Sequence, residues 1–252
     1  MSAGPGLVPG LVAELDAGLR TAGTPERAAG SKAYLKSDLD FYGAPVPALR
    51  ALVRALGTAS PGLARGDVLR LATALWEPRV FERRLLAVLV LGDRVDRLAA
   101  PDLDLLEAWV REGAMWALVD NISGDVAGPL VDRLGEPVAT ETLDRWASDG
   151  DVWVRRSALL AHLRSLRAGG GDWDRFTRYA DAMLDEREFW IRKAIGWVLR
   201  DTARRRPDLV FEWFLPRAGR ASGVTTREVL KYLSPKQQDR VNEVRSRTRS
   251  SG

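Results

Sequence analysis

The stretch that decides the fold spans residues 186–200 and reads EREFWIRKAIGWVLR. Acidic residues precede an aromatic residue, Trp190, and basic residues follow it two and three positions later. Three earlier stretches align with it on an aromatic residue: EPRVFERRLLAVLVL on Phe81, EGAMWALVDNISG on Trp116 and DGDVWVRRSALLAHL on Trp153. The four aromatic residues are 35, 37 and 37 positions apart. A repeat of this length, built from two helices, predicts a helical repeat protein.

Apolar residues elsewhere recur at spacings of three and four, as in Leu49, Leu52, Val53 and Leu56, which is typical of amphipathic helices. No segment alternates with period two, so the fold is predicted to be all-α. Two helix starts are indicated, by Thr24-Pro25-Glu26 and by a capping box in residues 225–228.

The repeat resembles a HEAT repeat, and stacked units of this kind form a solenoid (an α-α superhelix) whose second helices line a concave face. Charged residues at equivalent repeat positions are then expected on that face. They are Arg83, Arg84, Asp120, Arg155, Arg156, Arg192 and Lys193.

Composition excludes several classes of protein. The 252 residues are 46% apolar and 29% charged, and the longest apolar run, 85–91, is too short to cross a membrane. Cysteine is absent and His162 is the single histidine, which excludes disulfides and disfavours a metal site. No secretory signal is recognisable at the N-terminus, so a cytoplasmic protein is expected.

The net charge of +4 is unevenly distributed. Residues 1–150 carry a balance of −5, whereas residues 151–252 carry +9. The concave face is therefore expected to be basic. Residues 1–239 are predicted to form a single repeat domain, and the basic residues 240–252 a disordered tail.

The tryptophans divide into two groups. Trp116 and Asp120 lie one helical turn apart, and Trp197 lies two turns beyond Trp190 with Lys193 between them. An aromatic residue that shares a helix face with a charge is a candidate site residue, although Asp120 could equally be a surface carboxylate paired with an arginine. The tryptophans expected in the core are Trp76, Trp109, Trp146 and Trp173.

Four segments resemble the DNA alkylation repair glycosylases of the AlkD type. They are AYLKSDLDFYGAPVPALRALVR (33–54), WALVD (116–120), WVRRSALLAHL (153–163) and REFWIRKAIGWVLRD (187–201). The resemblance extends from about residue 24 to residue 232. It implies a HEAT-like solenoid that hydrolyses the N-glycosidic bond of cationic N3- and N7-alkylated purines in double-stranded DNA, bulky adducts included.

The resemblance also implies the site residues. The catalytic residues would be Asp120, Trp116 and Trp197, and Arg156 would hold a phosphate beside the lesion. The other residues expected to contact DNA are Tyr34, Lys36, Trp190, Arg192 and Lys193. No cofactor, metal or membrane is expected, and the enzyme would be a monomeric, monofunctional glycosylase.

Two other functions stay open at this point. A noncatalytic DNA-binding member of the same fold would keep the basic face without using the acid. A protein-binding HEAT scaffold would bind no nucleic acid. The presence of Asp120 favours the enzyme, and the +9 balance of residues 151–252 favours DNA over protein.

Overall fold

The computed structural model describes residues 6–250, with side chains to residue 248, and every regular element in this range is helical. The single β-type contact there is an isolated parallel bridge between Asp40 and Val80. The prediction of an all-α fold is confirmed. No described helix is both long enough and apolar enough to cross a membrane.

The chain divides into two compact units, Met1–Asp102 and Leu103–Gly252. The helices of the first unit are α1 (Leu7–Ala22), α2 (Pro25–Leu35), α3 (Val46–Ala59), α4 (Arg65–Trp76), α5 (Phe81–Asp93) and η1 (Val95–Arg97). Helix α6 (Asp102–Gly113) begins at the boundary and belongs almost wholly to the second unit. The predicted single domain over residues 1–239 stays a prediction.

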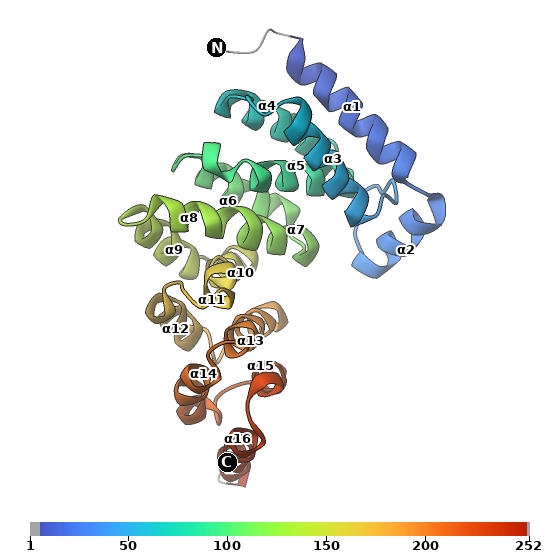
Figure 1. Cartoon of the computed structure of the whole chain (residues 1–252). Coiled ribbons are helices and arrows are strands. Elements are labelled where there is room, and N and C mark those ends of the chain that lie inside the picture. The colour runs from blue at the N-terminus through green and yellow to red at the C-terminus, as the bar shows by residue number, and fades with distance from the viewer. Residues whose placement is uncertain (1–5, 251–252) are drawn as a thin grey trace. The chain divides into compact units, whose positions relative to one another are not determined.

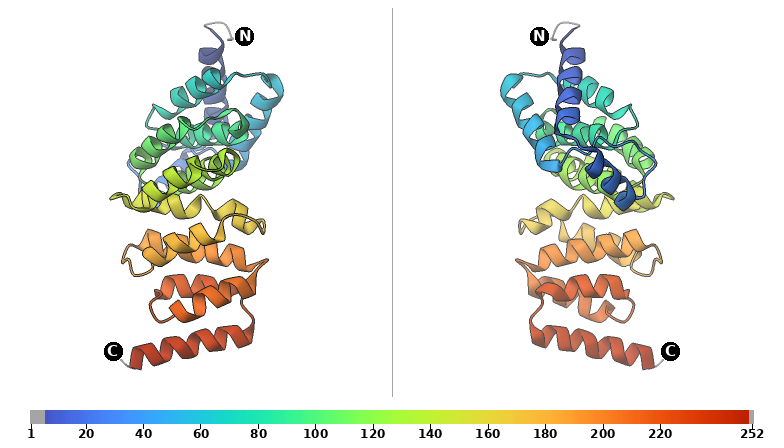
Figure 2. Two further views of the ribbon diagram at one scale, coloured as in Figure 1. Left: turned by 90° about the vertical axis from the view of Figure 1, so that its left-hand side faces the viewer. Right: turned by 90° about the vertical axis from the view of Figure 1, so that its right-hand side faces the viewer.

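The second unit continues through short helices that follow one another in chain order (Figures 1 and 2). They are α7 (Trp116–Asn121), the π-helical turn η2 (Ile122–Ala127), α8 (Gly128–Leu134), α9 (Val138–Ala147), α10 (Val152–Leu160), α11 (Leu163–Arg167), α12 (Trp173–Ala182), α13 (Phe189–Ala203), α14 (Pro207–Phe214), η3 (Leu215–Arg217), α15 (Gly223–Val229), η4 (Leu230–Tyr232) and α16 (Pro235–Ser250).

The helix starts test the capping predictions. Thr24 caps α2 by accepting a hydrogen bond from the Arg27 amide, with Pro25 in the first turn, as predicted. The capping box at residues 225–228 is wrong, because α15 begins earlier and Ser222 is its cap. Thr225 and Glu228 are instead buried inside the helix.

The predicted disordered tail is also wrong for residues 240–250, which belong to α16. This helix docks through Val241, which is fully buried, and through Arg245, whose guanidinium donates to the carbonyls of Ala218 and Ala221. The polar and basic composition of this segment predicted disorder and gave no sign of these two contacts. Residues 251 and 252 lie outside the described range.

The core prediction holds for three of the four tryptophans. Trp76, Trp109 and Trp146 are buried, as expected. The prediction for Trp173 is wrong. This side chain is only partly buried, because it begins α12 and packs edge-on against Trp213 near the surface.

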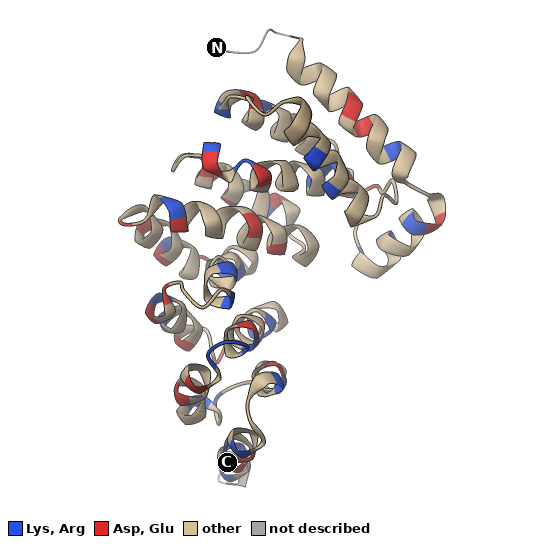
Figure 3. Cartoon of the chain, in the orientation of Figure 1, with Lys and Arg blue, Asp and Glu red and all other residues tan. Residues whose placement is uncertain are grey.

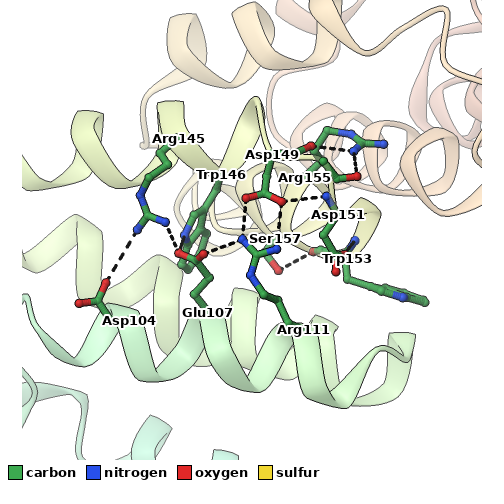
Figure 4. Close-up of polar contacts among 11 residues, drawn as sticks. Asp104, Glu107, Arg111, Arg145, Trp146, Asp149, Asp151, Trp153, Arg155 and Ser157 are labelled. Atoms are coloured by element: carbon green, nitrogen blue, oxygen red, sulfur yellow. Dashed lines mark hydrogen bonds and ion pairs between the residues drawn. The ribbon is translucent and has the colours of Figure 1, made fainter.

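Ion pairs join side chains about one repeat apart, with sequence separations of 34 to 39 residues. These inter-repeat ion pairs are Arg65–Asp102, Arg111–Asp149, Arg145–Glu107, Arg156–Asp120, Arg167–Asp201, Arg175–Glu136, Arg178–Asp144, Lys193–Glu228, Arg217–Asp181 and Arg220–Asp185. Figure 4 shows two of them: Glu107 of α6 meets Arg145 of α9, and Arg111 of α6 meets Asp149 in the turn between α9 and α10. The repeat period read from the aromatic residues therefore reappears as a period of ion pairs.

Close backbone approach joins η2 and α8 to the end of α10. A Cβ atom built on Gly128 would lie 2.2 Å from the Ala161 carbonyl oxygen, which is far inside van der Waals contact. A Cβ atom on Gly124, in the same run of helix, would meet only the Leu163 side chain, at 4.0 Å. Only the first glycine is required by packing.

We expect Gly128→Ala to lower the free energy of unfolding by about 1–3 kcal/mol, because the added methyl group forces the two helices apart. The matched variant Gly124→Ala should be neutral or stabilising by up to about 1 kcal/mol, since it removes backbone freedom from the unfolded chain. Urea denaturation of both variants measures the difference. Equal effects would show that the close approach at Gly128 is not a packing constraint.

Candidate active site

Helix α7 carries the first two site candidates. Trp116 is its first residue, following an extended backbone at Met115, and Asp120 lies one turn later. Both side chains are partly buried. The helix then widens into the π-helical turn η2 directly after Asn121, and such turns are frequent at functional sites.

Asp120 forms a two-point ion pair with Arg156 of α10. The arginine Nε donates to Oδ1 at 2.8 Å and Nη2 donates to Oδ2 at 2.9 Å. The aspartate side chain is 11% exposed and the arginine side chain 2%. This geometry fixes the carboxylate in the plane of the guanidinium and leaves little water around either group.

Arg156 also joins α10 to α13. Its Nη1 donates to the Trp190 carbonyl oxygen, and its guanidinium lies 5.5 Å from the centre of the Trp190 ring. The Trp190 ring in turn lies 5.5 Å from that of Trp153, which extends away from the polar contacts drawn in Figure 4. The structure thus brings Asp120, Arg156 and Trp190 together, and their role in a site stays a prediction.

The Asp120 carboxyl group is under two opposing influences. Burial raises its pKa above the ordinary 3.8, and the hydrogen bonds and positive charge of Arg156 lower it. Burial is the larger effect, so the net shift is upward. Arg156 is therefore the group that opposes the effect of burial on this carboxyl group.

Trp197 belongs to a second tryptophan–aspartate pair that sequence reasoning missed. Its indole N–H donates to Asp201 Oδ2 at 3.3 Å, one turn along α13. Asp201 is buried and pairs with Arg167, as Asp120 pairs with Arg156. The spacing of four between tryptophan and aspartate, identical to that of Trp116 and Asp120, is the signal that could have found this pair.

The cations predicted on α13 also have partners. The Lys193 ammonium donates to Glu228 Oε1 at 2.6 Å, and Arg200 and Lys231 donate to Glu228 Oε2. Burial raises the pKa of Glu228, but the three cations outweigh it and hold that pKa at about 2. Arg192 donates to the Glu186 carbonyl.

Tyr34 and Lys36 lie in the first unit, at the end of α2. Tyr34 is 74% exposed, and Lys36 is an exposed residue that ends the helix in the left-handed conformation. Their proposed contact with DNA stays a prediction.

The basic concave face also stays a prediction, and two of its expected members are placed elsewhere. Arg83 and Arg84 are buried and donate to the carbonyls that end α4, at Ala74, Leu75 and Trp76. Acidic and basic residues are interspersed along the helices of the second unit (Figure 3). A count of charges by sequence therefore overstates the number of free cations.

No cluster of three or more His, Cys, Asp or Glu side chains that could hold a metal ion occurs in the described residues. His162 is buried beside Phe176 and Tyr179, and burial lowers its pKa to about 4.

A double-mutant cycle measures the Asp120–Arg156 pair. We expect Asp120→Asn to lower the free energy of unfolding by about 3–5 kcal/mol, because Arg156 stays charged without its partner. Arg156→Met should cost less, since a buried aspartate can take up a proton. The double variant should lose less than the sum of the two, with a coupling of about 2 kcal/mol in urea denaturation. Additive losses would show that the two side chains do not interact.

Comparisons with known proteins identify the family of the chain. Residues 15–233 match the model of a family described as DNA alkylation repair enzyme. No curated protein matches the chain.

Among solved structures, a predicted DNA alkylation repair enzyme from Enterococcus faecalis is 26% identical with a TM-score of 0.74, over 84% of this chain and 97% of that one. AlkD2 from Streptococcus mutans is 18% identical with a TM-score of 0.51, over 77% of this chain and 86% of that one, which shows a shared fold. The helical repeat fold is thus confirmed. With the family model covering most of its length, the chain belongs to the DNA alkylation repair enzyme family.

Proposed function

We propose that this protein is a monofunctional DNA glycosylase that releases cationic N3- and N7-alkylated purines, bulky adducts included, from duplex DNA. The observation that carries the proposal is the Asp120 carboxylate, nearly buried, held at two points by Arg156 and one turn from Trp116. A desolvated, fixed carboxylate is suited to stabilising a positive charge that develops nearby.

The leaving group explains why so few residues suffice. An N3- or N7-alkylated purine carries a formal positive charge, so it departs as a neutral base with the electrons of the glycosidic bond. It needs no general acid, and the one histidine of the chain, His162, is buried beside Phe176 and Tyr179. Water then supplies the oxygen that bonds to the sugar carbon, and its proton passes to Asp120 or to solvent.

Positive charge builds on the deoxyribose as the base departs. The carboxylate of Asp120 would oppose that charge, and the indole faces of Trp116 and Trp197 would add negative potential. Because Arg156 fixes the Asp120 carboxyl group at two points and lowers its pKa against the effect of burial, it would contribute even without touching DNA.

Arg156 and Lys193 already have carboxylate partners, and these partners bear on any contact of the two cations with a DNA phosphate. Arg156 is buried against Asp120, and Lys193 is engaged by Glu228. A phosphate oxygen at either cation would replace or join a carboxylate. The engagement of Lys193 also favours attack by water over attack by an amine.

A noncatalytic DNA-binding protein is the second candidate. The observation that favours it is that Asp120–Arg156 is one of many inter-repeat ion pairs, so the pair is explained by the fold alone. In that case Asp120 would serve the fold alone.

Base release from duplexes that contain 7-methylguanine separates the two candidates. We expect the wild-type protein to release the base and Asp120→Asn to lose at least about a hundredfold in single-turnover rate, the usual scale for removing one electrostatic stabiliser. Rates are measured below the melting temperature of every variant, per folded molecule.

Asp102→Asn is the matched control, since Asp102 is buried in a two-point pair with Arg65 in the first unit. It should lose stability but keep its rate of base release. Wild-type protein that binds the duplex without releasing the base would support the noncatalytic alternative.

The pH dependence of base release gives a second test. Only ionised Asp120 is active, so the rate should fall on the acid side with a midpoint above 3.8, the ordinary aspartate value. Arg156→Met should move the midpoint further up. Single-turnover rates corrected for spontaneous base loss measure it, and an unmoved midpoint would contradict the role of Arg156.

A further inference from the structure

The turn that joins α12 to α13 exposes an aromatic ring beside the candidate active site. Phe189 is the first residue of α13, and 51% of its surface is exposed. A single exposed aromatic residue is ordinary on a protein surface and carries no meaning alone. Phe189 differs because of what its ring touches.

Phe189 is the outer member of a chain of ring contacts. Its ring meets Trp190 edge to face, with centroids 5.1 Å apart and planes at 79°. Trp190 lies against Trp153 at 5.5 Å and under the guanidinium of Arg156 at 5.5 Å. One residue, Trp190, therefore joins the exposed ring to the arginine that holds Asp120.

The turn carries one unpaired cation and one paired carboxylate. Arg187 is exposed and forms no hydrogen bond or ion pair with the described residues, whereas Glu186 is neutralised by Arg155 at two points. Glu188 lies between Arg187 and Phe189 and has an extended backbone, with φ −62° and ψ 120°. Arg187 therefore lies two residues before Phe189 in the same exposed turn.

We infer that Phe189 is a stacking site for an unpaired nucleobase of DNA, with Arg187 placed to contact the phosphate of the same strand. An aromatic ring backed by other rings and an adjacent unpaired cation are the two parts of a sequence-tolerant site for single nucleotides. The inference rests on the proposed function, since damaged duplexes supply the weakened or unpaired bases that would stack.

This site predicts a preference that is independent of base release. The protein should bind a duplex with one bulged, unmodified base more tightly than the same duplex fully paired. The whole preference should depend on the ring of Phe189, because a fully paired duplex offers no free base face. Stacking of one base on an aromatic side chain corresponds to a factor of about five or more in affinity.

Fluorescence anisotropy titrations at one fixed salt concentration measure both affinities. We expect Phe189→Ala to lose about fivefold in affinity for the bulged duplex and to keep its affinity for the paired one. Phe189→Tyr should retain the preference and Phe189→Leu should lose it, which separates stacking from bulk. The control is Tyr232→Ala, which removes another exposed ring of the second unit, stacked against Arg204 and outside this ring cluster.

An unchanged preference in Phe189→Ala and Phe189→Leu would overturn the inference, as would an equal loss in Tyr232→Ala or no preference in the wild type. The proposed function is judged separately, by base release from the alkylated duplex. If Phe189→Ala loses the preference for the bulged duplex but the wild-type protein releases no base, the stacking site is supported and the glycosylase is rejected. If the wild-type protein releases the base but shows no preference that depends on Phe189, the glycosylase is supported and the stacking site is rejected.

Discussion

The buried inter-repeat ion pairs are the interaction on which the placement of the charged side chains in the second unit depends. Each short helix buries too little apolar surface to be stable alone, so it must be held to the helices of the next repeat. Arginine suits this task, because its fork binds a carboxylate at two points and its remaining N–H groups reach carbonyl oxygens. Arg156 does both, binding Asp120 and the Trp190 carbonyl. The abundance of arginine thus has a structural cause within the chain.

The candidate active site is one of these ion pairs in an unusual environment. The pair Arg220–Asp185 is about half exposed on both sides, whereas Asp120 and Arg156 are nearly covered. An exposed pair contributes little to stability and its charges are screened by water. Burial makes the Asp120–Arg156 pair costly to break and makes its carboxylate strong as an electrostatic group. The same desolvation serves the fold and the proposed chemistry.

The sequence predicts the repeat well and the state of its charges poorly. The spacing of apolar and aromatic residues predicts the all-helical repeat fold, because that spacing depends on positions within a helix. The site residues come from the family resemblance and stay a prediction. Whether Arg156 is free or paired depends on a residue 36 positions away, which no local pattern specifies. The missed anchoring of α16 by Val241 has the same origin: one buried contact outweighs a polar composition.

The pairing of the cations constrains how this protein meets DNA. A free lysine or arginine that binds phosphate releases a counterion from the DNA, and affinity then falls steeply with salt. A cation that leaves a carboxylate for a phosphate exchanges one anion for another, and the displaced carboxylate gains water. For Lys193 that carboxylate is Glu228, which Arg200 and Lys231 continue to neutralise. For Arg156 it is Asp120, which no other described cation pairs with. Exchange of its carboxylate partner for a phosphate would therefore cost less at Lys193 than at Arg156.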